Sequence, residues 1–247
     1  MNKKEKMVKS FDLLYESWQV YAKNLLKFIE VFIYGLIGMV PMFVLLLLFY
    51  AYNVTGSGNL ASLGTKIVLG FIGIILFGVS LYYAIVYSLR AKVAGILLLK
   101  NNFTSARENF KASKPYVKTF LGVSLLTVVL VIAWGFVFLI PALVFGIYYG
   151  FASYILVLED RRPFTSVERS YDLVKGYFWP VFGRLAFMSL IVIIIYALIS
   201  IPMSGMVIGS APYIAYNVFT NIIWVVLSPY FIIYFYQIYQ SLNKVNK

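Results

Sequence analysis

"TFLGVSLLTVVLVIAWGFVFLIPALVFGIYYGFASYILVL", residues 119–158, is a run of 40 residues without a charged side chain. A helix needs about 20 apolar residues to cross the roughly 30 Å hydrocarbon core of a bilayer. The run therefore predicts two membrane spans in direct succession. Ile140-Pro141 predicts the break between them, because proline suits the first turn of a new helix.

The rest of the chain has the same apolar character. Of its 247 residues, 62% are hydrophobic and only 12% are charged, whereas a soluble domain is about a quarter charged. Further apolar runs at 28–52, 67–89, 185–203 and 214–239 are each long enough to cross a bilayer. These runs predict an all-α polytopic membrane protein with six transmembrane helices, folded as a single transmembrane domain over residues 1–247.

The basic residues predict the orientation of the spans. All but one of the 21 Lys and Arg residues lie in the two termini, in 90–118 or in 159–184, and the exception is Lys66. Six spans place these four segments on one face, and the positive-inside rule makes that face cytoplasmic. We therefore expect a multi-pass protein of the cell membrane, plasma or inner, with cytoplasmic N- and C-termini. The net charge of +12 then indicates topology and contact with membrane lipids, anionic on the cytoplasmic leaflet, rather than a nucleic-acid partner.

A charged segment with regularly spaced apolar residues occurs more than once. Residues 164–179, "FTSVERSYDLVKGYFW", match residues 103–118, "FTSARENFKASKPYVK", and 11–25 has the same +3, +4, +3, +4 apolar spacing of one helix face. Each copy precedes a pair of spans. This pattern predicts three parallel repeats, 10–100, 103–159 and 164–242, each an interfacial helix followed by a helical hairpin. The alternative is that cytoplasmic linkers of membrane proteins are generally amphipathic, without true repetition.

The third copy predicts the details of such a helix. Thr165 and Glu168 fit a capping box, and Gly176 suits a helix end. The apolar face would be formed by Phe164, Val167, Tyr171, Val174 and Phe178, while Glu168, Arg169 and Asp172 remain in water. Aromatic side chains favour headgroup depth, so the predicted lipid or interface contacts across the three copies are Trp18, Phe110, Tyr171, Phe178 and Trp179.

Residues 159–190 also resemble a family signature. An acidic residue ends a span, and a Ser-aromatic pair, a Leu, a Lys-Gly pair, an aromatic pair and a Gly follow: Glu159, Ser170-Tyr171, Leu173, Lys175-Gly176, Phe178-Trp179 and Gly183. The pattern resembles the prokaryotic membrane domain found beside glycerophosphodiester phosphodiesterases and related integral membrane families. The resemblance implies a six-span helical domain. The phosphodiesterase chemistry of such relatives resides in a separate soluble barrel that requires histidine, and this chain has none.

The composition narrows the function further. Without Cys or His, the chain offers no thiol nucleophile, imidazole base or ordinary zinc site. We predict no catalytic, cofactor-binding or metal-binding residues and no cofactor. The predicted function is a non-enzymatic accessory, scaffold or lipid-interacting role. The alternative is a transporter or permease component, for which Asn217 and Asn221 could line a polar cavity, although hydrogen bonding between helices is the simpler interpretation.

Overall fold

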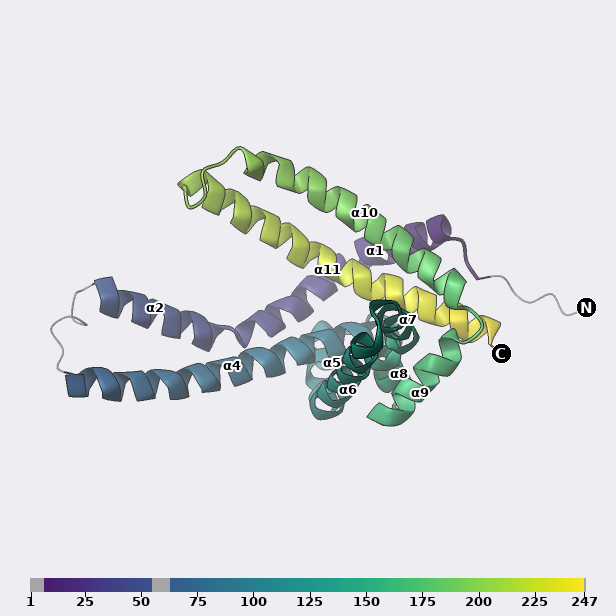
Figure 1. Ribbon diagram of the computed structural model, residues 1–247, viewed down its shortest axis with the longest axis horizontal. Coiled ribbons are helices and arrows are strands. Elements are labelled where there is room, and N and C mark those ends of the chain that lie inside the picture. Colours follow the sequence, from purple (N-terminus) through teal and green to yellow (C-terminus); the bar gives the residue numbers. More distant parts are fainter. Residues whose placement is uncertain (1–6, 55–62, 247) are drawn as a thin grey trace, which may run out of the picture. The chain divides into compact units, whose positions relative to one another are not determined.

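The computed structural model describes residues 7–54 and 63–246, and every regular element in these ranges is an α-helix (Figure 1). The helices are α1 Ser10–Ile37, α2 Val40–Val54, α4 Leu63–Lys100, α5 Ala106–Ala112, α6 Tyr116–Val137, α7 Leu139–Tyr149, α8 Ala152–Leu158, α9 Pro163–Val174, α10 Phe178–Ser204 and α11 Ala211–Val245.

Among the residues that the structure describes, five helical stretches are long and apolar enough to cross a membrane: Gly64–Lys100, Ala106–Phe136, Leu139–Leu158, Phe178–Ser204 and Ala211–Val245. A sixth is obtained when α1 and α2, which meet at a bend of 49°, are counted as one broken span. The chain is therefore an all-α, multi-pass membrane protein, as the apolar runs predict.

The bend between α1 and α2 has a cause in the sequence. Pro41 has no backbone N–H and cannot donate to the carbonyl of Ile37, so the helix is interrupted there. Gly38 lies at the break, and a Cβ atom on it would be only 2.3 Å from the Cβ of Tyr87 on α4. Glycine is thus required for this close approach of two helices.

The chain divides into two compact units, one formed by Met1–Leu25 with Thr119–Lys247 and the other by Leu26–Lys118. A single domain over residues 1–247 stays a prediction. In the second unit, α2 and α5 both pack against α4. In the first, α10 and α11 form an antiparallel hairpin, and α9 packs against α7 and α8 (Figure 1).

The core of the first unit lies at one end of the α10–α11 hairpin. There α8, α9 and the start of α1 meet the hairpin around a set of buried side chains: Leu13, Phe151, Ile155, Leu173, Val174, Val181, Met188, Tyr234, Ile238, Tyr239 and Leu242. Beyond this core, apolar side chains along the hairpin, such as Ile193 and Phe219, are exposed. Exposed apolar surface on helices of this length is what lipid would cover.

The three predicted copies begin their spans differently. In the first copy, α1 runs without interruption from Ser10 to Ile37, so the prediction of a separate short helix is wrong there. In the second, a turn at 113–115 separates α5 from α6. In the third, α9 and α10 are separated by a turn in which Gly176 has φ +85°.

Candidate interfacial site

Helix α9 starts earlier than its sequence predicts. Its first residue is Pro163, and Arg162 occupies the N-cap without a side-chain capping bond. The Thr165 hydroxyl instead donates to the Arg162 carbonyl oxygen at 3.0 Å. The capping box is therefore wrong, because Pro163, with its fixed φ and missing N–H, already suits the first helical position. The predicted end agrees with the structure, since α9 stops at Val174, just before Gly176.

The buried face of α9 is rotated relative to the predicted one. Its buried residues are Ser166, Val167, Ser170, Leu173 and Val174. Phe164, placed on the apolar face by spacing alone, is 73% exposed.

Backbone hydrogen bonding explains why two serines are buried. The Ser170 hydroxyl donates to the Tyr148 carbonyl oxygen at 2.7 Å and accepts from the Phe151 N–H at 3.2 Å. These groups lie at the break between α7 and α8, where they lack helical partners. The Ser166 hydroxyl donates to the Arg162 carbonyl oxygen at 2.9 Å. A serine that faces a helix break can be buried because it bonds to the free backbone groups there. A prediction from the spacing of apolar residues does not detect such a serine.

Three of the predicted contact residues lie near one another in the first unit. The ring of Tyr171 lies 4.8 Å from that of Tyr148, and the Phe178 ring stacks on Tyr148 from 5.6 Å. Trp179 contacts Phe178 edge to face at 5.3 Å but is 74% exposed. Tyr171 and Phe178 are thus half-buried against one tyrosine of the preceding span, and Trp179 points outward.

Phe110 holds the corresponding place in the second unit. It is buried, and its ring lies 5.2 Å from Tyr34 and 5.9 Å from Tyr87. The Arg90 guanidinium lies 4.2 Å from the centre of the Phe110 ring and donates to the Phe110 carbonyl oxygen at 2.9 Å. A cation over an aromatic face is an attractive contact, so Arg90 fixes α5 on α4.

Trp18 is half-exposed and packs on α11. Its ring lies 6.2 Å from Tyr230 and 5.4 Å from Tyr21. Hydrogen bonds hold the two helices together here: Tyr230 donates to the Leu14 carbonyl oxygen at 3.1 Å, and Tyr21 donates to that of Val226 at 2.8 Å.

A polar network lies beside α9, at the end of α8. Glu159 pairs with the Arg161 Nε at 2.7 Å, lies 3.7 Å from the Arg169 Nε and accepts from the Tyr239 hydroxyl at 3.0 Å. Arg169 also donates to the Asn243 side-chain oxygen at 3.1 Å. The prediction that Arg169 stays in water is therefore wrong: it is half-buried and joins α9 to α8 and α11.

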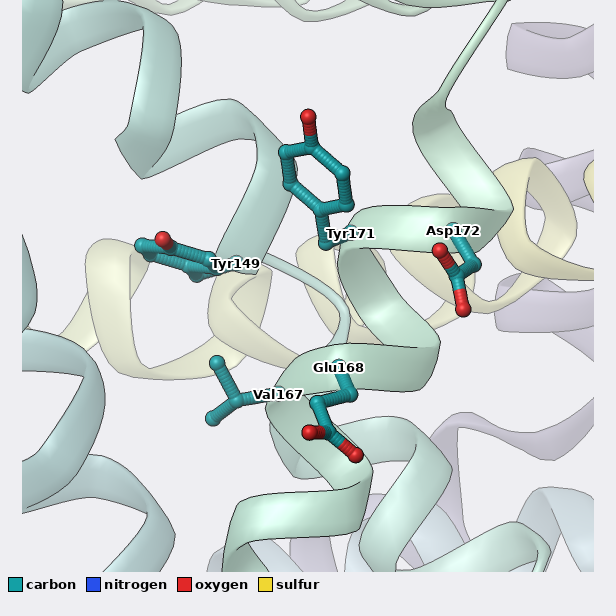
Figure 2. Close-up of a pocket in the computed structure, with 5 residues that line it drawn as sticks. All are labelled: Tyr149, Val167, Glu168, Tyr171 and Asp172. Atoms are coloured by element: carbon teal, nitrogen blue, oxygen red, sulfur yellow. The ribbon is translucent and has the colours of Figure 1, made fainter.

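A hollow of about 480 Å³ lies beside α9, lined by Tyr149, Val167, Glu168, Tyr171 and Asp172. Glu168 and Asp172 are exposed, as predicted. Figure 2 shows their carboxylates pointing away from the Tyr171 ring. The two acids therefore do not converge with the tyrosines on one point of the hollow.

Two other features bear on ligand binding. Within residues 7–54 and 63–246, no three Asp or Glu side chains lie close enough to hold a metal ion. Asn221 donates to the backbone and side-chain oxygens of Asn217, at 2.7 and 2.9 Å. These bonds lie within α11, whereas the sequence favoured bonds between helices.

Comparisons of the chain with models of protein families, with curated proteins and with solved structures find no match. The resemblance of residues 159–190 to a family of membrane domains accordingly stays a prediction.

Proposed function

We propose that the chain is a non-enzymatic, lipid-interacting accessory protein of the plasma or inner membrane. In this proposal, three helical segments anchor the spans at the cytoplasmic leaflet through their aromatic side chains. One observation carries the proposal: each segment holds an aromatic side chain against a tyrosine of a span, and the first and third segments also leave other aromatic side chains uncovered.

The inward contacts share a pattern. Trp18 packs on Tyr230, Phe110 on Tyr87 and Tyr171 on Tyr148. The same number of residues separates Tyr87 from Phe110 as separates Tyr148 from Tyr171. In both cases the tyrosine belongs to the span that precedes the segment. This equivalence of the second and third copies supports the proposed repeat.

The outward side chains support contact with lipid. Phe11, Phe164 and Trp179 are 74%, 73% and 74% exposed, and each lies near the start of a helix that packs in the core of the first unit. Covering one such side chain stabilises by about 1.5–3 kcal/mol. Headgroup depth suits these residues, because tryptophan and amphipathic helices partition to the membrane interface.

The orientation in this proposal has both termini in the cytoplasm, for which the distribution of Lys and Arg is the support. The transporter alternative has no comparable support within the described residues. Its best candidate for a polar cavity, the pair Asn217 and Asn221, is satisfied along one helix.

The proposal is tested by counting lipids that remain bound. Wild type, purified in a mild maltoside detergent, is expected to retain phospholipid in native mass spectra. The variant F11S/F164S/W179S is expected to retain less. F136S/F138S/F219S is the matched control, because it removes three exposed aromatic side chains from the opposite ends of the spans. Wild type without bound phospholipid, or equal losses in the two variants, would contradict the proposal.

A further inference from the structure

The segment from Arg90 to Lys118 is far more basic than its counterpart. It carries seven basic side chains against one acid, Glu108, whereas 159–184 carries five basic side chains against four acids. The positive-inside rule explains an excess of cations on one face of a membrane. It does not require the cations to occupy any particular side of a helix.

Four of the basic residues are arranged along one side of a helical run. Arg107, Lys111, Lys114 and Lys118 follow one another at +4, +3 and +4, the spacing of a single helix face. They lie on α5, on the turn at 113–115 and at the start of α6, within the nearly continuous stretch Ala106–Phe136. The four residues, here called the basic stripe, extend over about 16 Å at the 1.5 Å rise of a helix.

The side chains of the basic stripe are unpaired within the described part of the chain, and the helix that carries them is held in place by other residues. All four side chains are exposed, and among the described residues none forms an ion pair with a carboxylate. On the opposite side of α5, the buried Asn109 donates to Thr104 Oγ1 at 3.0 Å and to the Ser105 carbonyl oxygen at 2.9 Å. The Ser105 hydroxyl accepts from the Glu108 N–H at the N-cap. The helix is therefore held in place without using the charges of the stripe.

We propose that the basic stripe binds the phosphates of anionic phospholipids, a proposal that rests on the lipid-interacting function above. Charge complementarity identifies the occupant: four unpaired cations next to a span face the anionic surface of the cytoplasmic leaflet. Long Lys and Arg side chains lay their stems on apolar surface and extend their charge to the headgroups. Arg107 adds a guanidinium that can bind phosphate through two parallel hydrogen bonds.

The equivalent positions on the third copy sharpen this assignment. Alignment of 103–118 with 164–179 places Glu168, Asp172, Lys175 and Trp179 opposite the members of the stripe. The two acids replace Arg107 and Lys111 and would repel phosphate. The basic stripe is therefore expected to select anionic lipid, and the matching side of α9 is not.

The test uses the full purified chain in detergent that contains phosphatidylcholine. Phosphatidylglycerol is titrated into this sample, and the melting temperature of the protein is measured at each step. Wild type is expected to be stabilised by phosphatidylglycerol, since a ligand that binds the folded state raises its stability. R107Q/K111Q/K114Q/K118Q is expected to bind it more weakly, by about fivefold for each charge lost. K9Q/K23Q/R162Q/K244Q is the control, because it removes four other exposed cations and gives the same net charge. Its affinity is expected to change less than about threefold.

A gain-of-function variant covers the case in which the quadruple variant does not fold. E168K/D172K places two cations at exposed positions of α9 and is expected to strengthen binding of phosphatidylglycerol. Equal affinity of the stripe variant and its control, or no gain in E168K/D172K, would overturn the stripe. Wild type that retains phospholipid but binds phosphatidylglycerol and phosphatidylcholine equally would overturn the stripe alone. Wild type that retains neither lipid would overturn the proposed function itself.

Discussion

Residues 103–118 and 164–179 use similar inward contacts and opposite outward charges. Inward, each places a buried polar side chain at a helix break or turn, Asn109 in one and Ser170 in the other. Each also packs the next residue, Phe110 or Tyr171, on a tyrosine of the preceding span. Outward, the first segment presents the basic stripe and the second presents two carboxylates.

This comparison distinguishes the residues that position each helix from the residues that the helix presents to its surroundings. The buried polar residue and the aromatic residue after it fix where α5 and α9 lie. The exposed residues are free to differ, because substitutions at such sites usually change stability by less than about 0.5 kcal/mol. The inward contacts are therefore expected to determine the stability of the two segments, and the outward ones their choice of lipid.

The largest effect is expected at the aromatic contact. Phe110→Ala should destabilise by about 3–5 kcal/mol, as for a phenylalanine lost from a packed core, because Phe110 is 7% exposed. Tyr171→Ala should cost less, about 1.5–3 kcal/mol, since Tyr171 is only half-buried. Unfolding free energies in a single detergent measure both losses. Phe219→Ala is the control and should change little, because Phe219 is exposed and lies outside the proposed lipid contacts. If Tyr171→Ala costs more than Phe110→Ala, the inward contacts of the two segments are not ranked by burial.

A smaller loss is expected at the buried polar position. Ser170→Ala leaves the Phe151 N–H and the Tyr148 carbonyl oxygen without the hydroxyl that bonds both. An unsatisfied buried polar group costs about 1–3 kcal/mol. Ser166→Ala is the matched control, because among the described residues that hydroxyl bonds only to the carbonyl oxygen of the N-cap residue Arg162. It should cost less than about 1 kcal/mol. Equal losses of stability in the two variants would show that the hydrogen bonds of Ser170 across the α7–α8 break contribute no more than the single bond of Ser166.

The spans could be predicted from the sequence because they depend on long apolar runs, such as 119–158. The end of α9 near Gly176 also follows from its pattern. Its start at Pro163 and the rotation of its buried face do not. Ser166 and Ser170 count as polar in any periodicity. The break at Gly150 gives the Ser170 hydroxyl its buried partners, and the Ser166 hydroxyl bonds to the Arg162 carbonyl oxygen. The continuity of α1 does not follow from the spacing of residues 11–25 either. The helix continues to Ile37 and ends only near Gly38 and Pro41, well beyond that segment.

The candidate site was predictable in part. Aromatic spacing singled out Tyr171 and Phe178, which share contacts with Tyr148. The hydrogen bonds of Arg169 were missed, because its partners on α8 and α11 are distant in sequence. The basic stripe was visible in the spacing of its four cations, but the positive-inside rule already accounted for their number.

The smallest effect is expected at Arg169, and it tests whether charge contributes to the position of α9. Arg169 and Glu159 are 32% and 21% exposed in their side chains. An ion pair at such a site contributes at most about 1 kcal/mol, so Arg169→Gln should cost about 0.5–1 kcal/mol. High salt should reduce this cost, because the screening length falls to about 3 Å at 1 M.

The aligned residue on α5 provides the control for this comparison. Glu108 is exposed and forms no side-chain ion pair among the residues that the structure describes, so Glu108→Gln should change stability by less than about 0.5 kcal/mol. A double-mutant cycle of Glu159→Gln with Arg169→Gln isolates the pair, since residues in one network show coupling that distant residues lack. A coupling of zero, with equal losses for Arg169→Gln and Glu108→Gln, would mean that α9 is held by its serines and aromatic side chains alone. A salt-sensitive coupling would instead show that an ion pair helps to hold α9 in place, whereas Glu108 on α5 makes no such pair with any described residue. In that case Arg169 of α9 stabilises the fold, while the cations of the basic stripe on α5 remain free to bind lipid.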